Sequence, residues 1–421
     1  MKSGKQVMIE LKSLAYGGDA VGRLPDGRAA FVPLALPGET VLADVVEERR
    51  GFARLALVEV LQPSPQRVQP RCRHFGDCGG CHYQHLPYPD QLAAKSAILR
   101  DQLARIAGIA EPPLQPIVAS PEPYYYRNHV QFHLDEQGRL GYHRLRSNAT
   151  LAIQECHLPE AALNGLWPQL DFEALPELER IGLRLGAGDE VLLTLESQAL
   201  EAPELSVEDL PLSVVHLSPA GALVMAGSPA LVIEVLGRPF RVSAGAFFQV
   251  NTPMAEAMVE HLLEHLPRFA TLGPQTTLLD VYCGVGLFSA FLASRVGRLI
   301  GVEVSPAACE DFAVNLDEFD NVALYEAPAE MALPALPARP AGAEPSVVLV
   351  DPPREGLDRR ALDAIVGLEP AVIAYVSCDP ATLARDAARL AAQGYRLAQV
   401  TPFDLFPQTY HIESISFFKK A

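Results

Sequence analysis

The stretch Thr277-Leu-Leu-Asp280-Val-Tyr282-Cys-Gly284-Val-Gly286-Leu-Phe288 decides how the second half of the chain folds. Its apolar start is typical of a buried strand, and residues 286–295 continue with helical spacing. The two glycines let the backbone approach a bound molecule closely, because glycine has no side chain. The stretch therefore predicts a strand, a ligand-binding turn and a helix, in that order.

The same alternation of strand and helix continues toward the C-terminus. Pro306 is placed to open a helix between the first and second of three further apolar runs, which are Arg298–Glu303, Val347–Val350 and Val372–Val376. Strands that alternate with helices form a doubly wound α/β sheet of parallel strands, and ligands bind at the carboxyl ends of those strands. We therefore expect a Rossmann-like domain over residues 241–421, with functional residues just after each strand.

Two cofactors fit the Gly-x-Gly turn. Glu303 ends the next strand, where a carboxylate can accept hydrogen bonds from both hydroxyls of a ribose. A dinucleotide site calls for a third glycine three residues after Gly286, and Ser289 stands there instead. S-adenosylmethionine has no pyrophosphate and does not need that glycine. The turn therefore favours S-adenosylmethionine over a nicotinamide dinucleotide, whose oxidoreductases share this fold.

Reactive groups follow the later strands at the expected sheet edge. Asp351-Pro-Pro-Arg354 has an arginine where amino-methylating enzymes usually place an aromatic residue. Cys378 precedes Pro380, where a helix dipole could lower the pKa of the thiol. Glu413 has apolar neighbours, which could raise the pKa of its carboxyl group and make it a base. The simpler interpretations are an inert buried cysteine and a salt-bridged glutamate at the end of a strand.

A nucleophile, a base and a methyl donor together suit methylation of carbon 5 of uracil. That carbon alone is too weak a nucleophile to attack a methyl sulfonium. Addition of the Cys378 thiolate to carbon 6 would give an enolate that can take the methyl group. Glu413 would then remove the carbon 5 proton before the cysteine is eliminated. The uridine must be unpaired or flipped out of its helix for this attack.

The first 61 residues are expected to form a small OB-like barrel, because short strand-like runs alternate with glycine turns. The net charge of the chain is −17, but residues 1–150 hold 18 Lys and Arg against 15 Asp and Glu, a balance of +3. Residues 151–421 hold 16 against 36. The arginine cluster from Arg49 to Arg73 is equally consistent with a phosphate-binding surface and a solvated face. An RNA-binding protein without catalysis is the non-enzymatic alternative.

Residues 62–240 are expected to form a β-rich central region, with a helix over Tyr88–Ile109 and a hairpin over Tyr124–Arg146. The start at Met1–Lys5 has no apolar export signal, and no apolar run is long enough to span a bilayer, so the cytoplasm is the expected compartment. Seven cysteines in such a chain favour metal binding or catalysis over disulfides. Four thiolates could hold zinc or an iron–sulfur cluster, and the candidates are Cys72, Cys78, Cys81 and Cys156.

These motifs in this order resemble the RNA uridine-C5 methyltransferase family. Residues 1–61 resemble the TRAM domain that many members carry in front. Asp379 and Leu287 depart from the family pattern, which often has asparagine after the cysteine and a polar residue after the Gly-x-Gly. The motifs that carry the resemblance are Phe247–Asn251, Asp280–Gly286, Asp351–Arg354, Ser377–Asp386 and Phe406–Glu413.

The resemblance implies a role for each motif. Cys378 would be the nucleophile and Glu413 the base. Contacts to S-adenosylmethionine would come from Gln249, Tyr282, Glu303 and Asp351. The cysteine spacing is similar to that of the members that methylate 23S ribosomal RNA, in which it holds a structural 4Fe–4S cluster. The expected partner is therefore RNA, with 23S ribosomal RNA favoured over transfer RNA, and neither a membrane nor DNA is expected.

Overall fold

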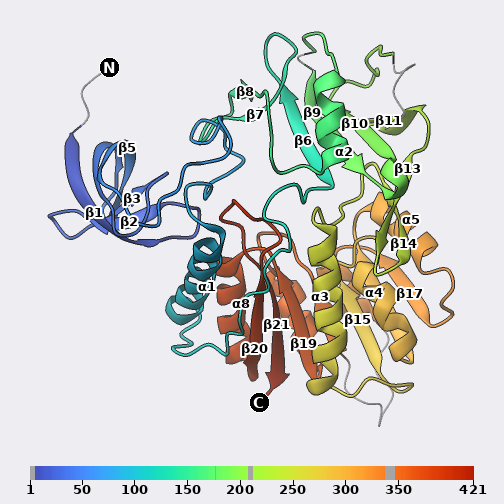
Figure 1. Cartoon of the computed structure of the whole chain (residues 1–421). Coiled ribbons are helices and arrows are strands. Elements are labelled where there is room, and N and C mark those ends of the chain that lie inside the picture. The colour runs from blue at the N-terminus through green and yellow to red at the C-terminus, as the bar shows by residue number, and fades with distance from the viewer. Residues whose placement is uncertain (1–4, 176, 207–211, 337–346) are drawn as a thin grey trace.

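The computed structural model describes residues 5–175, 177–206, 212–336 and 347–421, so all but one residue of the segment Met1–Lys5 lies outside the description. Three bodies are visible in Figure 1: a small barrel, a central sheet and a larger α/β unit. None of the helices in the described ranges is long and apolar enough to cross a membrane.

The N-terminal body is a closed five-stranded barrel, as the sequence predicts. Its strands follow the order β1-β2-β3-β5-β4. Alternate side chains such as Ile9 and Leu11 point into the barrel core, where they are buried. The strands are β1 (Gln6–Leu14), β2 (Ala20–Arg23), β3 (Ala29–Val32), β4 (Thr40–Glu48) and β5 (Phe52–Gln62).

The central body is β-rich, which confirms the expectation for this region. A seven-stranded sheet has the order β12-β11-β10-β9-β6-β7-β8, and the expected hairpin is the pair β6–β7, with Gly138 in the left-handed region at φ 79°. The strands are β6 (His129–Leu134), β7 (Leu140–His143), β8 (Thr150–Ala152), β9 (Leu178–Leu185), β10 (Val191–Ser197), β11 (Leu212–Ser218) and β12 (Gly221–Ala226), accompanied by α2 (Ala161–Leu166) and 3-10 turns at Trp167–Gln169 and Ala187–Asp189.

The C-terminal body is a seven-stranded sheet of order β17-β16-β15-β18-β19-β21-β20. Separate hydrophobic clusters cover its two faces, as expected of a doubly wound fold. The strands are β15 (Thr277–Val281), β16 (Arg298–Glu303), β17 (Val322–Glu326), β18 (Val347–Val350), β19 (Val372–Ser377), β20 (Tyr395–Phe403) and β21 (Glu413–Lys420). The helices are α3 (Thr252–His265), α4 (Leu287–Leu292), α5 (Pro306–Asn315), α6 (Ala329–Ala335), α7 (Arg359–Gly367) and α8 (Pro380–Ala392), with 3-10 turns at Leu266–Arg268 and Ala293–Arg295.

One strand of this sheet departs from the expected parallel arrangement. β21 pairs antiparallel with both β19 and β20, and it lies between them. The hairpin β20–β21 therefore returns through the sheet and brings the amino end of β21 to the edge where the parallel strands end. Outside the sheet, β13 (Ala230–Val235) and β14 (Arg238–Ser243) form a separate hairpin before α3.

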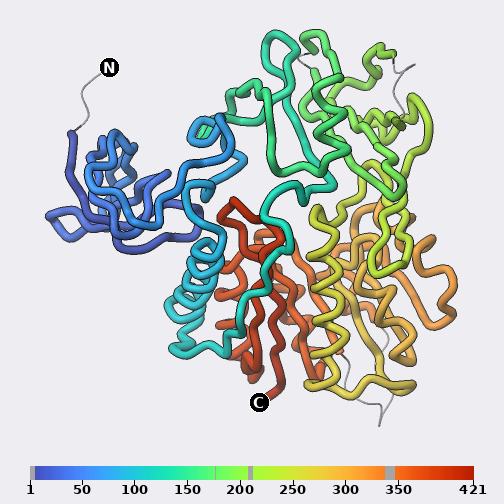
Figure 2. Tube along the Cα trace, viewed as in Figure 1, coloured from blue at the N-terminus to red at the C-terminus, as the bar shows by residue number. Residues whose placement is uncertain are grey.

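A helix from the central segment packs against the C-terminal body. Helix α1 (Tyr88–Arg105) is four residues shorter than expected, and it packs against α8. Figure 2 shows α1 running beside the C-terminal strands, although the two are about 300 residues apart in the chain. The helix therefore contacts the part of the sheet in which β20 and β21 lie.

Candidate active site

The Gly-x-Gly turn has the geometry that its sequence requires. Gly286 caps the start of α4 in the left-handed region at φ 90°. A Cβ at this position would lie 2.4 Å from Leu316 Cδ1 and 2.9 Å from Phe312 Cδ2. At Gly284, by contrast, a Cβ would meet no atom within 4 Å. Packing therefore requires the second glycine, whereas the first faces open space in which a ligand could lie.

Glu303 lies against this turn and is held by backbone donors. Its Oε2 accepts a hydrogen bond from the N–H of Gly284 at 2.9 Å, and its Oε1 accepts from Val304 and Ser305, each at 2.8 Å. Tyr282, on the other side of the turn, has a left-handed backbone at φ 67° and is half-buried. The turn, Glu303 and Tyr282 thus form one rigid surface at the ends of β15 and β16.

Two more carboxyl groups stand beside Glu303. Burial and the neighbouring carboxylates raise the pKa of Asp280 and of Asp351 to about 7. Ser289, which occupies the position where a dinucleotide site would have glycine, donates a hydrogen bond of 2.6 Å to Asp280 Oδ2. Asp280 Oδ1 has no hydrogen-bond partner. Grouped carboxyls that repel one another are suited to a ligand that carries positive charge.

Gln249 lies in a segment that is fixed on both sides. Its backbone carbonyl accepts a hydrogen bond from Asn128 Nδ2 at 3.1 Å. Two residues later, the fully buried Asn251 caps α3 and donates to Leu405 O at 3.1 Å. The preceding Phe247 is 66% exposed. The segment therefore presents a buried amide and an open aromatic ring next to the loop that follows β20.

Cys378 and Glu413 face one another across two neighbouring strands. The antiparallel pairing of β19 with β21 ends at Ser377 opposite Ser414, so the next positions in register are Cys378 and Glu413. Both lie at the edge that also carries Asp351 and Arg354. The structure thus brings together a thiol and a carboxyl group that are 35 residues apart in the sequence.

The expectation that the helix dipole lowers the pKa of Cys378 is wrong. α8 does begin at Pro380, with Asp379 as its capping residue. Burial nevertheless raises the thiol pKa to about 12, and the nearby Glu413 and Asp351 carboxyls reinforce the shift while Arg354 opposes it. Burial of the thiol, reinforced by the neighbouring carboxyl groups, outweighs the effect of one helix terminus.

Glu413 is a buried carboxyl group without an ion pair in the described part of the chain, which is not what a salt-bridged strand end would show. Burial raises its pKa well above the usual value, and Asp351 adds to the effect. Arg354 and Lys95 lower it. The carboxyl group therefore has the raised affinity for protons that a general base needs.

The loop that delivers Glu413, residues 404–412, is fixed by side chains that the sequence analysis did not single out. The side chain of Gln91 on α1 forms two hydrogen bonds with Gln408. Gln91 Nε2 donates to Gln408 Oε1 at 2.9 Å, and the backbone N–H of Gln408 donates to Gln91 Oε1 at 3.0 Å. Gln408 holds a left-handed backbone at φ 68°. Its carbonyl accepts hydrogen bonds from the N–H groups of His82 and Tyr83. A signal did exist, since the buried face of α1 includes polar residues, namely Gln91, Lys95 and Gln102.

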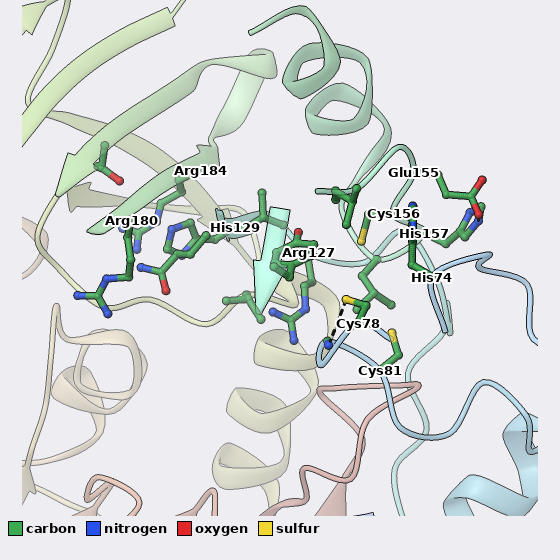
Figure 3. A pocket seen from close by; sticks show the side chains of 18 of the residues that line it. His74, Cys78, Cys81, Arg127, His129, Glu155, Cys156, His157, Arg180 and Arg184 are labelled. Carbon is green, nitrogen blue, oxygen red and sulfur yellow. Dashed lines mark hydrogen bonds and ion pairs between the residues drawn. The ribbon is translucent and has the colours of Figure 1, made fainter. Parts of the chain in front are cut away.

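The four candidate cysteine ligands line one cavity of about 580 Å³. Figure 3 shows Cys78, Cys81 and Cys156 with their sulfur atoms directed toward a shared space. None of the four forms a disulfide. The segment with Cys78 is joined to the central sheet, since Gly79 N donates to His143 O at 2.9 Å. The fold therefore gathers thiols from residues 72–81 and from position 156.

These thiols do not form a metal-binding arrangement as they stand. Within the described ranges, no three His, Cys, Asp or Glu side chains are placed so that they could hold a metal ion. Burial raises the pKa of Cys78 to about 11. The donor set suits a thiolate-bound cluster in its chemistry, but the sulfur positions would have to close further around it.

Most of the arginine cluster is neutralised within the protein. Arg67 forms an ion pair of 2.6 Å with the buried Glu39, and Arg49 pairs with Glu47. Arg73 contacts Glu155, and Arg71 lies over the ring of Tyr124 at 5.1 Å. Each of these four arginines therefore has a partner within the protein, while Arg49 and Arg73 stay largely exposed.

The whole chain has a known methyltransferase architecture. A tRNA (uracil-54, C5)-methyltransferase of Pyrococcus abyssi, solved with S-adenosyl-L-homocysteine, superposes with a TM-score of 0.71 at 23% sequence identity. The match covers 98% of this chain and all of that one. This chain therefore shares the overall fold of that methyltransferase.

Sequence comparisons give the family. The model described as tRNA (Uracil-5-)-methyltransferase matches residues 230–421, and the TRAM domain model matches residues 2–55. An RNA methyltransferase of Thermosynechococcus vestitus is 34% identical over 99% of this chain and 98% of its own length. One from Aquifex aeolicus is 33% identical over 98% of both chains. The chain belongs to the RNA uracil-5-methyltransferase family and is an S-adenosylmethionine-dependent enzyme that acts on RNA.

Proposed function

We propose that this enzyme methylates carbon 5 of one uridine in 23S ribosomal RNA through a covalent bond between Cys378 and carbon 6. The observation that carries the proposal is the register of β19 and β21, which sets Cys378 opposite Glu413. This one pair supplies both the thiol and the buried carboxyl group that the reaction needs.

The surroundings of the thiol suggest how it becomes a nucleophile. With a pKa of about 12, Cys378 holds its proton at neutral pH. Part of that shift comes from the Glu413 and Asp351 carboxyls, so a cation bound among them would lower the pKa again. S-adenosylmethionine supplies such a cation together with the methyl group. Attack by the thiol would therefore follow the binding of both substrates.

Glu413 would complete the reaction as the base. After methylation, carbon 5 carries a methyl group and a proton. The Glu413 carboxylate takes that proton, the electrons of the carbon–hydrogen bond re-form the double bond between carbons 5 and 6, and Cys378 leaves as the thiolate. The raised pKa of Glu413 favours its acceptance of the proton.

The cofactor contacts would come from four residues around the turn. Glu303 is already oriented by three backbone donors, and it would accept the ribose hydroxyls. Asp351 would face the positive end of the cofactor. Tyr282 would offer a half-buried ring, and Gln249 a buried amide, at the borders of the same space.

We also propose that Cys72, Cys78, Cys81 and Cys156 hold a structural 4Fe–4S cluster. Support comes from their common cavity and their lack of disulfides. The thiols must move closer together to bind it, because they do not form a metal site as placed. Iron analysis and visible absorption of protein purified without oxygen test the proposal. Zinc without iron, or no metal, would refute it.

The division of labour follows the three bodies. We assign residues 1–61 to RNA binding, residues 62–240 to the cysteine site, and residues 241–421 to methyl transfer. The fold neighbour acts on transfer RNA, so the target separates two outcomes. Mapping of 5-methyluridine in RNA from cells with and without the gene tests the proposal. Loss of one site in 23S ribosomal RNA is expected. Loss in transfer RNA alone would overturn the target, and no loss in either would overturn the function.

A further inference from the structure

A buried ion pair lies under the loop that delivers Glu413. Lys95 of α1 and Asp404 are both fully buried, and Lys95 Nζ lies 2.5 Å from Asp404 Oδ1. The same ammonium donates to the carbonyl of Phe406 at 3.0 Å. The Tyr88 hydroxyl also lies near the Asp404 carboxylate, which helps burial to raise the pKa of Tyr88. The Lys95 ammonium therefore joins the helix to the first and third residues of the loop.

Stability alone does not account for this pair. Burying an ammonium and a carboxylate has a desolvation cost that their attraction rarely exceeds, and apolar residues of the same size often do as well. A role in the reaction therefore explains this charged pair better than a role in stability.

The position of the pair relative to Glu413 supplies that contribution. Phe403, the last residue of β20, pairs with Glu413, the first residue of β21. Asp404 is therefore the first residue of the loop that joins β20 to β21, and it lies next to Glu413. The Lys95 charge reaches Glu413 and lowers its pKa, and Glu413 in turn raises the pKa of Lys95, against the larger effect of burial.

Other titratable groups surround Glu413 and the ion pair. The hydroxyls of Tyr88 and Tyr126 lie near Asp404, and burial raises the pKa of both. Glu413 faces Asp351 and Arg354 of the loop after β18, and Cys378 after β19. Arg354 is exposed, so its charge is partly screened by solvent. The Lys95 ammonium also lies near two histidines, His82 and His411. Burial lowers their pKa values to about 4 and about 3, so both are neutral near pH 7. Lys95 is thus the buried cation beside the base.

We propose that Lys95, anchored by Asp404, is a positioning residue that orients the loop 404–412 and favours the carboxylate form of Glu413. The proposal rests on the role of Glu413 as the base. Proton removal from carbon 5 requires the carboxylate form. Loss of the Lys95 charge therefore raises the pH needed for that step, and the bond between Cys378 and carbon 6 then persists at lower pH.

The test compares a variant that keeps a cation with one that removes it. Lys95→Arg keeps a cation beside Asp404, and Asp404→Asn combined with Lys95→Met removes the cation while leaving no unpaired carboxylate. Single-turnover methylation and the fraction of covalent protein–RNA adduct are measured from pH 5.5 to about 9, with thermal unfolding in parallel. We expect the acidic limb of the double variant to shift upward by about one pH unit, with roughly tenfold slower turnover below it and more adduct. Lys95→Arg is expected to show no upward shift.

The outcomes separate the two proposals. An unshifted acidic limb in the double variant, whatever its unfolding temperature, would show that the pair is only structural. The single variant Lys95→Met is expected to unfold at a lower temperature, because it strands the Asp404 carboxylate. If the unsubstituted enzyme forms neither an adduct nor 5-methyluridine, the proposed covalent function fails, and that result is visible before any variant is compared.

Discussion

The ring of Tyr16 in the barrel meets the ring of Tyr410 edge-on, with centroids 5.5 Å apart. Tyr410 belongs to the loop that leads to Glu413, and the carboxylate of Asp379, next to Cys378, also lies near the Tyr16 hydroxyl, where it helps burial to raise the pKa of that group. On the same barrel turn, Gly18 packs closely against His82. The barrel therefore touches the catalytic edge directly.

Replacing Tyr16 should lower the efficiency of RNA methylation without changing the affinity for S-adenosylmethionine. An aromatic edge contact contributes about 0.5–1.5 kcal/mol, so Tyr16→Ala should lower kcat/KM for RNA by roughly two- to tenfold. The affinity for S-adenosylmethionine should stay unchanged. Tyr16→Phe keeps the ring and serves as the control. Equal losses in the two variants would place the effect in the hydroxyl group instead of the ring contact.

Cys378→Ala should abolish methyl transfer, by roughly a thousandfold or more, because no other group can form the bond to carbon 6. RNA affinity, measured by filter binding, should remain. Cys309→Ala is the matched control, since Cys309 is a buried thiol on α5 in the same domain. Continued turnover by the Cys378 variant would rule out covalent catalysis by this residue.

Glu413→Gln should trap the methylated RNA on the enzyme. Glutamine has the shape of glutamate but cannot take the carbon 5 proton, so the bond to Cys378 is not released. A slow band of protein joined to RNA is expected on a denaturing gel. The band should vanish when Cys378→Ala is added. A Glu413 variant that turns over normally and leaves no adduct would remove Glu413 from the mechanism.

The affinity for S-adenosylmethionine should rise with pH. The folded enzyme holds the pKa of Asp351 at about 7, so the group gains its negative charge as pH increases through 7. A carboxylate attracts the sulfonium, whereas the neutral acid does not. Calorimetry between pH 6 and 8 should show this rise in affinity for S-adenosylmethionine. A weaker rise is expected for S-adenosylhomocysteine, which lacks the sulfonium charge. Asp351→Asn should flatten the dependence, and a steep curve in that variant would assign the effect elsewhere.

The two glycines of the turn should differ in what their replacement damages. Gly286→Ala forces a Cβ against Leu316 and Phe312 at a positive φ, and should lower the free energy of unfolding by about 1–3 kcal/mol. Gly284→Ala meets no protein atom and should cost less stability. It should instead weaken cofactor binding, since the methyl group enters the open space. Chemical unfolding and calorimetry on both variants distinguish the two effects, and a reversed order would contradict this description of the turn.

The sequence predicted those parts of the site that follow from local pattern. Motifs follow four of the parallel strands, β15, β16, β18 and β19, so an edge with Glu303, Asp351 and Cys378 could be expected from the alternation of strands and helices. The antiparallel course of β21 could not, because the short apolar run after Glu413 has no directional signal. Lys95 could have been noticed as a charge on the apolar face of a helix, but its partner Asp404 lies 309 residues away.

The pKa of the Cys378 thiol shows why other properties of the site could not be predicted from the sequence. From the chain near Cys378, only the following helix was visible, and its dipole points to a lower pKa. The strongest influence is burial of the thiol, followed by the Glu413 and Asp351 carboxyls, and all of these arise only when the sheet is assembled. Long-range charges of this kind depend on tertiary structure. For the same reason, the sequence proposed four cysteine ligands but could not say how closely their sulfur atoms meet.

Because β21 is inserted between β19 and β20, the strand that starts with Glu413 is also part of the interior of the sheet. A messenger cut short before codon 413 would yield a product that lacks both the base and the strand that joins its neighbours. Such a product would expose the unpaired edges of β19 and β20 and become a substrate for proteolysis. Truncation therefore should not leave a stable protein that binds RNA and stalls with a uridine bound to its cysteine.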